Sequence, residues 1–303
     1  MVVERGRRGN NQLFCERTKT SGMAALRVSR KSLVKGYAER TGAVLKIAAD
    51  LPDRPSPDEI HDLRVAARRI RVMRGLMPRS IRVSPDSKRL DLALRSVLKS
   101  TSQLRDMDTL VDTLKSHKGN LPAGLLVRLE NQRSDFALRA KATIGALTEV
   151  QVPELDASKL RGKPLSRRFR KRVQKHSKNA SSLLTQVLND ESKLVDLHSL
   201  RKEVKKMRYL LELAAKTQAR LASLAKWQDS LGAIHDLDVA IAYLKGVGAG
   251  TGRGAIPELQ RARHSNYLAF VRAYGTDQTQ ALGEGSVPSA GALAPASLHP
   301  AEA

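Results

Sequence analysis

The chain has 303 residues, of which 41% are hydrophobic and only 3% aromatic, and its 54 Lys and Arg against 30 Asp and Glu give a net charge of +24. A core of Leu, Ala and Val with few aromatic side chains favours helices over sheets. The charge indicates a polyanionic partner: nucleic acid, acidic lipid, or a small or polymeric phosphate. A single cysteine, Cys15, excludes an internal disulfide, and no apolar run is long enough to span a membrane, so we expect a cytoplasmic protein.

Helical periodicity runs through most of the chain and no strand pattern is visible. The expected helices lie near residues 32–50, 57–77, 85–117, 122–147, 164–188, 193–215, 218–244 and 257–274. Proline at the start of several of them suits the first helical turn, where its missing N–H costs little. We therefore predict an all-α chain of two four-helix halves. The predicted boundaries are a disordered extension at 1–28, a first half at 29–147, a linker at 148–163, a second half at 164–275 and a flexible tail at 276–303. Whether translation starts at Met1 or Met23 stays open.

Two motifs occur once in each half and in the same order. The first reads H-x-L-R-x-x-x-[RK]-[RK]-x-R and begins at His61 and again at His198. The second pairs Leu104-Arg105-Asp106-Met107-Asp108 with Ile234-His235-Asp236-Leu237-Asp238. Motifs that recur in the same order indicate duplication of a four-helix unit.

The first motif places cations in a row along one face of a helix. His61, Arg64, Arg68 and Arg71 fall within an arc of about 80°, and apolar residues such as Leu63 point the other way. Neighbours one turn apart, some 5 Å, suit a ligand with evenly spaced anionic groups. An ordinary amphipathic helix with a solvated basic face is the alternative. Like charges at these spacings repel, so the repeated pattern favours binding.

These motifs, together with Leu231-Gly232-x-Ile234-His235-Asp236, resemble those of the CHAD family, the conserved histidine α-helical domain, over about residues 29–275. The resemblance implies two four-helix bundles related by a pseudo-twofold axis around a basic central groove or pore. It also implies binding of inorganic polyphosphate and association with polyphosphate granules. Some members carry a fused triphosphate-tunnel phosphatase domain with an E-x-E-x-K motif, which this sequence lacks. His235 stands where the first half has Arg105, a difference that bears on strength of binding more than on function.

We expect the ligand to meet cations and histidines of both motifs and of the basic run at 161–178, which has nine Lys or Arg and no acid. Arg can bind two phosphate oxygens with its planar fork, whereas Lys acts as a point charge. The predicted polyphosphate-binding residues are His61, Arg64, Arg68, Arg69, Arg71, Arg105, Arg167, Arg168, Lys171, Lys175, His198, Arg201, Lys202, Lys205, Lys206, Arg208 and His235. The basic run could equally be a nucleic-acid patch, and each histidine could be a structural residue at a helix start. Arg261 and Arg263 are expected to be surface cations outside the site.

The carboxylates of the second motif are predicted to be structural. Two carboxylates at i and i+2 do not share a helix face, so we expect Asp106 and Asp236 to orient the motif arginines rather than to bind a metal. The sequence has no P-loop, no G-x-G-x-x-G and no Cys/His pair. A phosphohistidine at His61 or His198 is disfavoured because no acid is placed to orient the ring. We predict no catalytic residue, no metal and no cofactor.

Nucleic acid is the main alternative partner to polyphosphate. The charge permits it, but single-strand binders interleave aromatic residues for base stacking, and here the few aromatic residues are scattered. No membrane partner is predicted, and the oligomeric state, monomer or homodimer, stays open.

Overall fold

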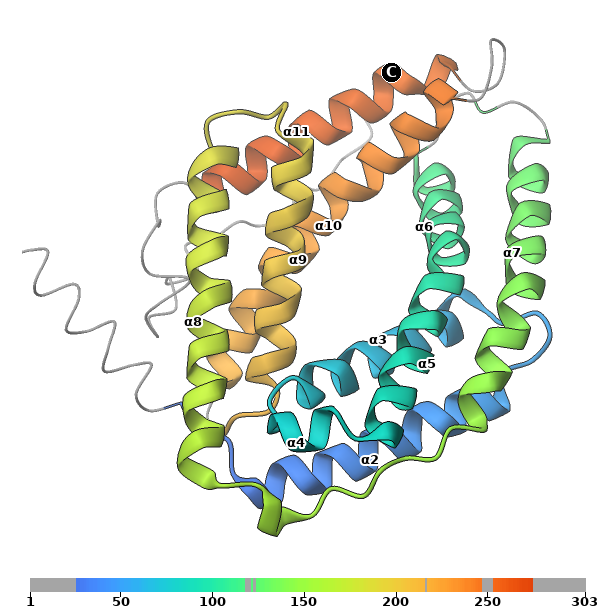
Figure 1. Ribbon diagram of the computed structural model, residues 1–303. Helices are drawn as coiled ribbons and strands as arrows, with labels where there is room; N and C mark the ends of the chain where they lie inside the picture. Colours follow the sequence, from blue (N-terminus) through green and yellow to red (C-terminus); the bar gives the residue numbers. More distant parts are fainter. Residues whose placement is uncertain (1–25, 118–120, 122–123, 216, 247–252, 275–303) are drawn as a thin grey trace, which may run out of the picture.

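The computed structural model describes residues 26–117, 121, 124–215, 217–246 and 253–274. Within these ranges every regular element is a helix (Figure 1), which confirms the all-α prediction. No helix in the described ranges is long and apolar enough to cross a membrane. The predicted flexible tail and nearly all of the predicted N-terminal extension lie outside the described residues.

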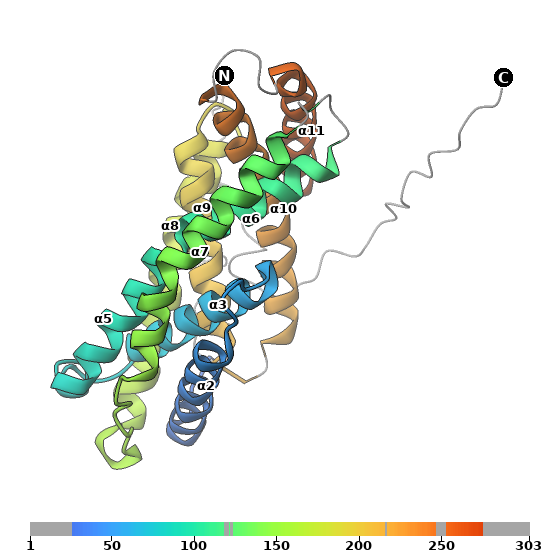
Figure 2. The ribbon, with the colours of Figure 1, turned by 90° about the vertical axis from the view of Figure 1, so that its right-hand side faces the viewer.

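The helices form two groups along the chain. The first group consists of α2 (Arg30–Asp50), α3 (Pro57–Arg74), the short α4 (Arg79–Arg82), α5 (Pro85–Ser100), α6 (Ser102–Ser116) and α7 (Leu125–Thr148). The second consists of the short η1 (Ala157–Lys159), α8 (Gly162–Val187), α9 (Leu194–Leu211), α10 (Gln218–Gly246), η2 (Arg253–Ala255) and α11 (Ile256–Tyr274). Helix α8 packs on α9, α9 on α10 and α10 on α11, while α6 and α10 join the two groups (Figures 1 and 2).

The start of α3 is fixed by a capping box. The Glu59 amide donates to Ser56 Oγ (3.2 Å), and the Ser56 amide donates to Glu59 Oε2 (2.7 Å). Pro57 occupies the first helical turn, where no amide hydrogen is needed. Because the helix begins at a defined residue, the first copy of the basic motif has a defined orientation.

The helix predicted at 85–117 is broken at Thr101, so that prediction was wrong. The Thr101 backbone has φ −89° and ψ 7°, and its hydroxyl donates to the Val97 carbonyl (2.7 Å). Arg64 Nη1 donates to the Leu98 carbonyl (2.8 Å) and to Thr101 Oγ1 (2.6 Å). The motif arginine thus satisfies acceptors that the end of α5 leaves without a helical partner.

The hydrophobic core crosses from one group to the other. One cluster runs from α2 and α3 to α8, α9 and α10, and a second joins α6 and α7 to α10 and α11. Leu26 and Val28 are buried in the first cluster, so the packed part begins inside the predicted extension. The segment predicted as a linker is also packed: Leu160 is fully buried, and its carbonyl accepts from Arg30 Nη1 (3.4 Å).

Each group contains the same buried ion pair. Arg133 Nε donates to Asp108 Oδ1 (2.5 Å), and Arg263 Nε donates to Asp238 Oδ1 (2.7 Å). Each arginine also donates to a backbone carbonyl just before the motif helix, at residue 55 (2.7 Å) and residue 191 (3.1 Å) respectively. The matched contacts support internal duplication, which stays a prediction. Arg263 is only 8% exposed, so it is not the surface cation we expected.

Candidate anion-binding site

Two adjoining cavities lie between α3, α6, α9 and α10. One, of about 510 Å³, extends along α10 and is here called the α10 cavity; the other, of about 670 Å³, reaches α8 and is called the α8 cavity. Six residues line both cavities and form what we call their shared wall: Arg64, Arg68, Asp106, Arg201, Lys205 and His235. The wall therefore collects four cations and one carboxylate from α3, α6 and α9.

The two basic ladders meet here because each motif helix buries its opposite face. Leu63 on α3 and Leu200 on α9 are fully buried in the core. Arg64 and Arg68, four residues apart, then share the face of α3 that lines the wall. Arg201 and Lys205, also four residues apart, share the face of α9 that lines the wall. His61 lines the α10 cavity and His198 the α8 cavity, so the two motif histidines lie on different sides of the wall.

The cavities differ in charge. The α8 cavity adds the cations Arg71, Arg172, Lys202 and Lys206 to those of the wall, and of the described residues that line it Asp106 is the one carboxylate. Of the described residues, the α10 cavity adds one cation, Arg105, together with Asp229 and Asp236. The α8 cavity therefore attracts anions more strongly.

Two arginines of the wall keep a buried donor free. Arg64 is 7% exposed, and its Nη1 is used at the break between α5 and α6. Arg201 Nη2 makes a long contact with Asp236 Oδ1 (3.9 Å). The Nε atoms of Arg64 and Arg201 are buried and lack a hydrogen-bond partner within the described part of the chain. Unsatisfied buried donors are groups that an anion or an ordered water would satisfy.

Crowding and burial lower the pKa values of cations in the wall. Burial, followed by the charges of Arg201 and Arg68, lowers the pKa of Lys205 from 10.5 to about 7. Burial also lowers the pKa of Arg64 to about 10. In each case burial removes solvation from the protonated form and neighbouring cations repel it, so an incoming polyanion would favour protonation.

Three histidines of the site, His61, His198 and His235, have lowered pKa values. The rings of His198 and His235 lie 4.5 Å apart between centroids, and their Nδ1 atoms are 3.3 Å apart. Burial, with nearby cations, lowers the pKa of both and brings that of His235 to about 3. Burial and Arg105 lower the pKa of His61 in the same direction. A lowered pKa favours the neutral imidazole, which offers a ligand single hydrogen bonds rather than charge.

Several predicted site residues do not line either cavity. Arg69 donates to Glu212 (Nε to Oε2, 2.8 Å), and Arg208 donates to Gln228 (3.0 Å) and contacts Glu212 (3.7 Å). Arg168 Nε donates to the Leu76 carbonyl (2.7 Å). Arg167, Lys171 and Lys175 are exposed and lie on the other side of α8 from its buried face. The prediction that these six residues line the cavities was wrong, because acceptors on neighbouring elements hold Arg69, Arg168 and Arg208, and the other three lie on the outer face of α8.

Two residues of α8 that the prediction omitted do line the α8 cavity. Arg172 and His176 lie beside the buried stripe that contains Phe169. The His176 ring is held through Nδ1 by Glu203 Oε2 (2.7 Å), a carboxylate that also accepts from Lys206 (2.6 Å). The apolar residues of α8 mark its buried face, and polar residues next to that face are the ones that can reach the cavity. This pattern in the sequence would have identified both residues.

The carboxylates of the second motif divide into two roles. Asp108 and its counterpart in the second half form the buried ion pairs described above, while Asp106 and Asp236 lie at the cavities near the motif arginines. Burial raises the pKa of Asp106, which Arg64 and Arg201 partly counteract. In the described ranges, no group of three or more His, Cys, Asp or Glu side chains is arranged to hold a metal ion.

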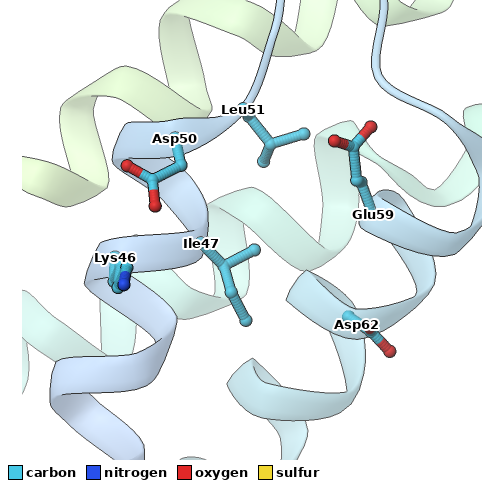
Figure 3. A pocket seen from close by; sticks show the side chains of 6 residues that line it. All are labelled: Lys46, Ile47, Asp50, Leu51, Glu59 and Asp62. Carbon is cyan, nitrogen blue, oxygen red and sulfur yellow. The ribbon is translucent and has the colours of Figure 1, made fainter.

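A separate hollow of about 220 Å³ between the end of α2 and the start of α3 is acidic (Figure 3). It is lined by Lys46, Ile47, Asp50, Leu51, Glu59 and Asp62. Glu59 serves the capping box, and apolar side chains lie between Asp50 and Glu59 (Figure 3). Its charge excludes it as a site for polyanions.

Comparison with known proteins agrees with this architecture. The CHAD domain family model matches residues 39–245, so the chain belongs to the CHAD domain family. The matched range contains every residue that lines the two cavities. The crystal structure of the CHAD domain from the plant Ricinus communis is similar at 22% identity and a TM-score of 0.51, covering 84% of this chain and 90% of that one. At this identity the likeness concerns the fold alone. No curated protein matches the chain.

Proposed function

We propose that the chain binds inorganic polyphosphate in the two cavities and catalyses no reaction on it. The observation that carries the proposal is the meeting of two cationic ladders, from α3 and α9, at the shared wall. A polyphosphate chain offers regularly spaced anionic groups to both ladders and needs cations but no base stacking. Running past the wall, it would occupy both cavities as one basic pore.

The non-enzymatic part of the proposal follows from the chemistry of the two cavities. Phosphoryl transfer usually uses phosphates bound to metal ions. Here Asp106 and Asp236 lie beside arginines, which hold phosphate by direct hydrogen bonds instead. On this proposal the protein works in the cytoplasm at polyphosphate granules, as a monomer or a homodimer, and stores, organises or reports on the polymer.

The test is competition combined with a charge-matched variant. Labelled long-chain polyphosphate is displaced by unlabelled polyphosphate, DNA, RNA or heparin at one physiological salt concentration. The cavity variant replaces Arg68, Arg172, Arg201 and Lys202 with Gln. The control variant replaces Arg128, Lys226, Lys245 and Arg261, all exposed, with Gln. Each variant lowers the net charge of +24 by four.

Polyphosphate should be the strongest competitor, and the cavity variant should lose affinity. Charge-assisted hydrogen bonds contribute roughly 1.5–3 kcal/mol each, so even two lost contacts correspond to about a hundredfold. Helical circular dichroism checks that the variants fold. Equal affinities of the folded cavity and control variants, or stronger competition by DNA or RNA, would contradict the proposal.

A further inference from the structure

We propose that the outer face of α8 is a second contact surface for the same polyphosphate chain, reached after the chain leaves the α8 cavity. The surface, here called the outer strip, consists of Arg167, Lys171, Lys175 and Lys178. The inference rests on the proposed function, and it adds a reason for the protein to prefer long chains over short ones.

The outer strip is charged, exposed and unpaired. Its four side chains are all exposed, and none forms an ion pair with a described residue. Helix α8 contains no Asp or Glu from Gly162 to Val187. Residues 167 to 178 extend about 16 Å along the helix at 1.5 Å per residue. Like charges four residues apart destabilise a helix, so the strip has no evident role in folding.

Cations continue from the cavity to the strip around α8. Arg172, at one edge of the buried face, lines the α8 cavity. From Arg172 through Arg168, Lys175 and Lys171 each step around the helix is about 40° or less. Arg168 lies between the cavity and the strip, and its Nε donates to a backbone carbonyl. Because α8 lies at one edge of the molecule (Figure 1), a chain leaving the cavity can follow these cations outward.

The strip ends in a second basic hollow. At the start of α8 a surface hollow of about 750 Å³ is lined by Arg27, Lys163, Pro164, Ser166, Arg167 and Arg170. It contains four cations and, among the described residues that line it, no carboxylate. Arg167 belongs to both the outer strip and this hollow. The geometry thus offers a polyanion continuous favourable contacts from the cavity across α8.

The experiment compares a strip variant with the control variant on two polyphosphates and on single-stranded DNA. The strip variant replaces Arg167, Lys171, Lys175 and Lys178 with Gln, and so carries the same net charge as the control. Tripolyphosphate serves as the ligand short enough for the cavities alone, and long-chain polyphosphate as the ligand that reaches the strip. Affinities are measured by titration over a series of salt concentrations.

The strip variant should bind tripolyphosphate as the wild type does and should bind long chains about tenfold more weakly than the control, given the usual size of exposed ionic contacts. For long chains, the plot of log affinity against log salt concentration should be shallower for the strip variant than for the control, by about 3. This difference corresponds to four lost phosphate contacts at about 0.7 each, by analogy with single-stranded nucleic acid. Neither change is expected for tripolyphosphate.

Equal long-chain affinities of the strip and control variants would overturn the proposal that the outer strip binds polyphosphate. That result would not contradict binding in the cavities. Loss of affinity for single-stranded DNA with unchanged long-chain binding would also overturn the proposal for the strip, and would assign the strip to nucleic acid. The proposed function is tested separately, because only the cavity variant should lose tripolyphosphate binding.

Discussion

Binding of polyphosphate should be coupled to uptake of a proton by Lys205, and Lys205→Arg should abolish that uptake. Lys205 lies in the shared wall, where burial and the charges of Arg201 and Arg68 lower its pKa to about 7. A bound polyanion favours the ammonium form and raises this pKa toward its usual 10.5. An arginine at the same position stays protonated in both states.

The size and sign follow from these two pKa values. If the polyanion restores the usual lysine pKa of 10.5 in full, from about 7 in the free protein, binding takes up about 0.9 proton at pH 8 and about 0.1 at pH 6. Affinity is therefore highest below pH 7, where Lys205 is already protonated, and decreases as the pH rises through the pKa of the free protein. From pH 7 to pH 9 the decrease amounts to about fiftyfold.

Isothermal titration calorimetry in two buffers with different ionisation enthalpies measures the uptake. The wild type and the Lys205→Arg variant are titrated with the same polyphosphate, so that titration of the ligand's end groups cancels in the difference. Equal proton uptake by the two proteins at pH 8 would refute the reasoning, because the proton would then have another origin.

Three further predictions concern the framework and the chemistry. Arg263→Ala should lower the free energy of unfolding by about 3 kcal/mol, because it removes a buried cation and leaves the partly buried Asp238 without its partner, whereas Arg261→Ala should change it by less than about 0.5 kcal/mol; urea denaturation showing equal effects would contradict this. Thr101→Val should destabilise by about 1–3 kcal/mol, because Arg64 loses an acceptor at the break between α5 and α6, and an unchanged thermal transition would contradict that role. The purified protein with Mg²⁺ or Mn²⁺ should release no phosphate from polyphosphate, and a release that His61→Ala abolishes would contradict the absence of catalysis.

Most helices and the faces they present follow from local patterns. The capping box at Ser56 and Glu59 marks the start of α3, and the spacing of Leu63 against Arg64 and Arg68 identifies its buried and its basic face. These features depend on residues within one or two turns of one another, so the sequence is sufficient to reveal them. The family resemblance adds the expectation that both motifs face one site.

The break at Thr101 could not be predicted in this way. Buried positions at 94, 97, 101, 104, 108 and 111 continue the helical spacing straight through it. The partner that stabilises the break, Arg64, lies 37 residues earlier in the chain. A pattern read along one helix contains no information about such a contact.

The sequence by itself determined that the chain is helical and which helix faces are cationic, because helical periodicity is a property of neighbouring residues. Only the tertiary structure decided which cations share a cavity. It paired Arg69 and Arg208 with Glu212, turned Arg172 toward the α8 cavity, and placed Lys205 where its pKa falls to about 7. The physical reason is that ion pairing and desolvation depend on distances between helices, and these are fixed only when the buried stripes pack together.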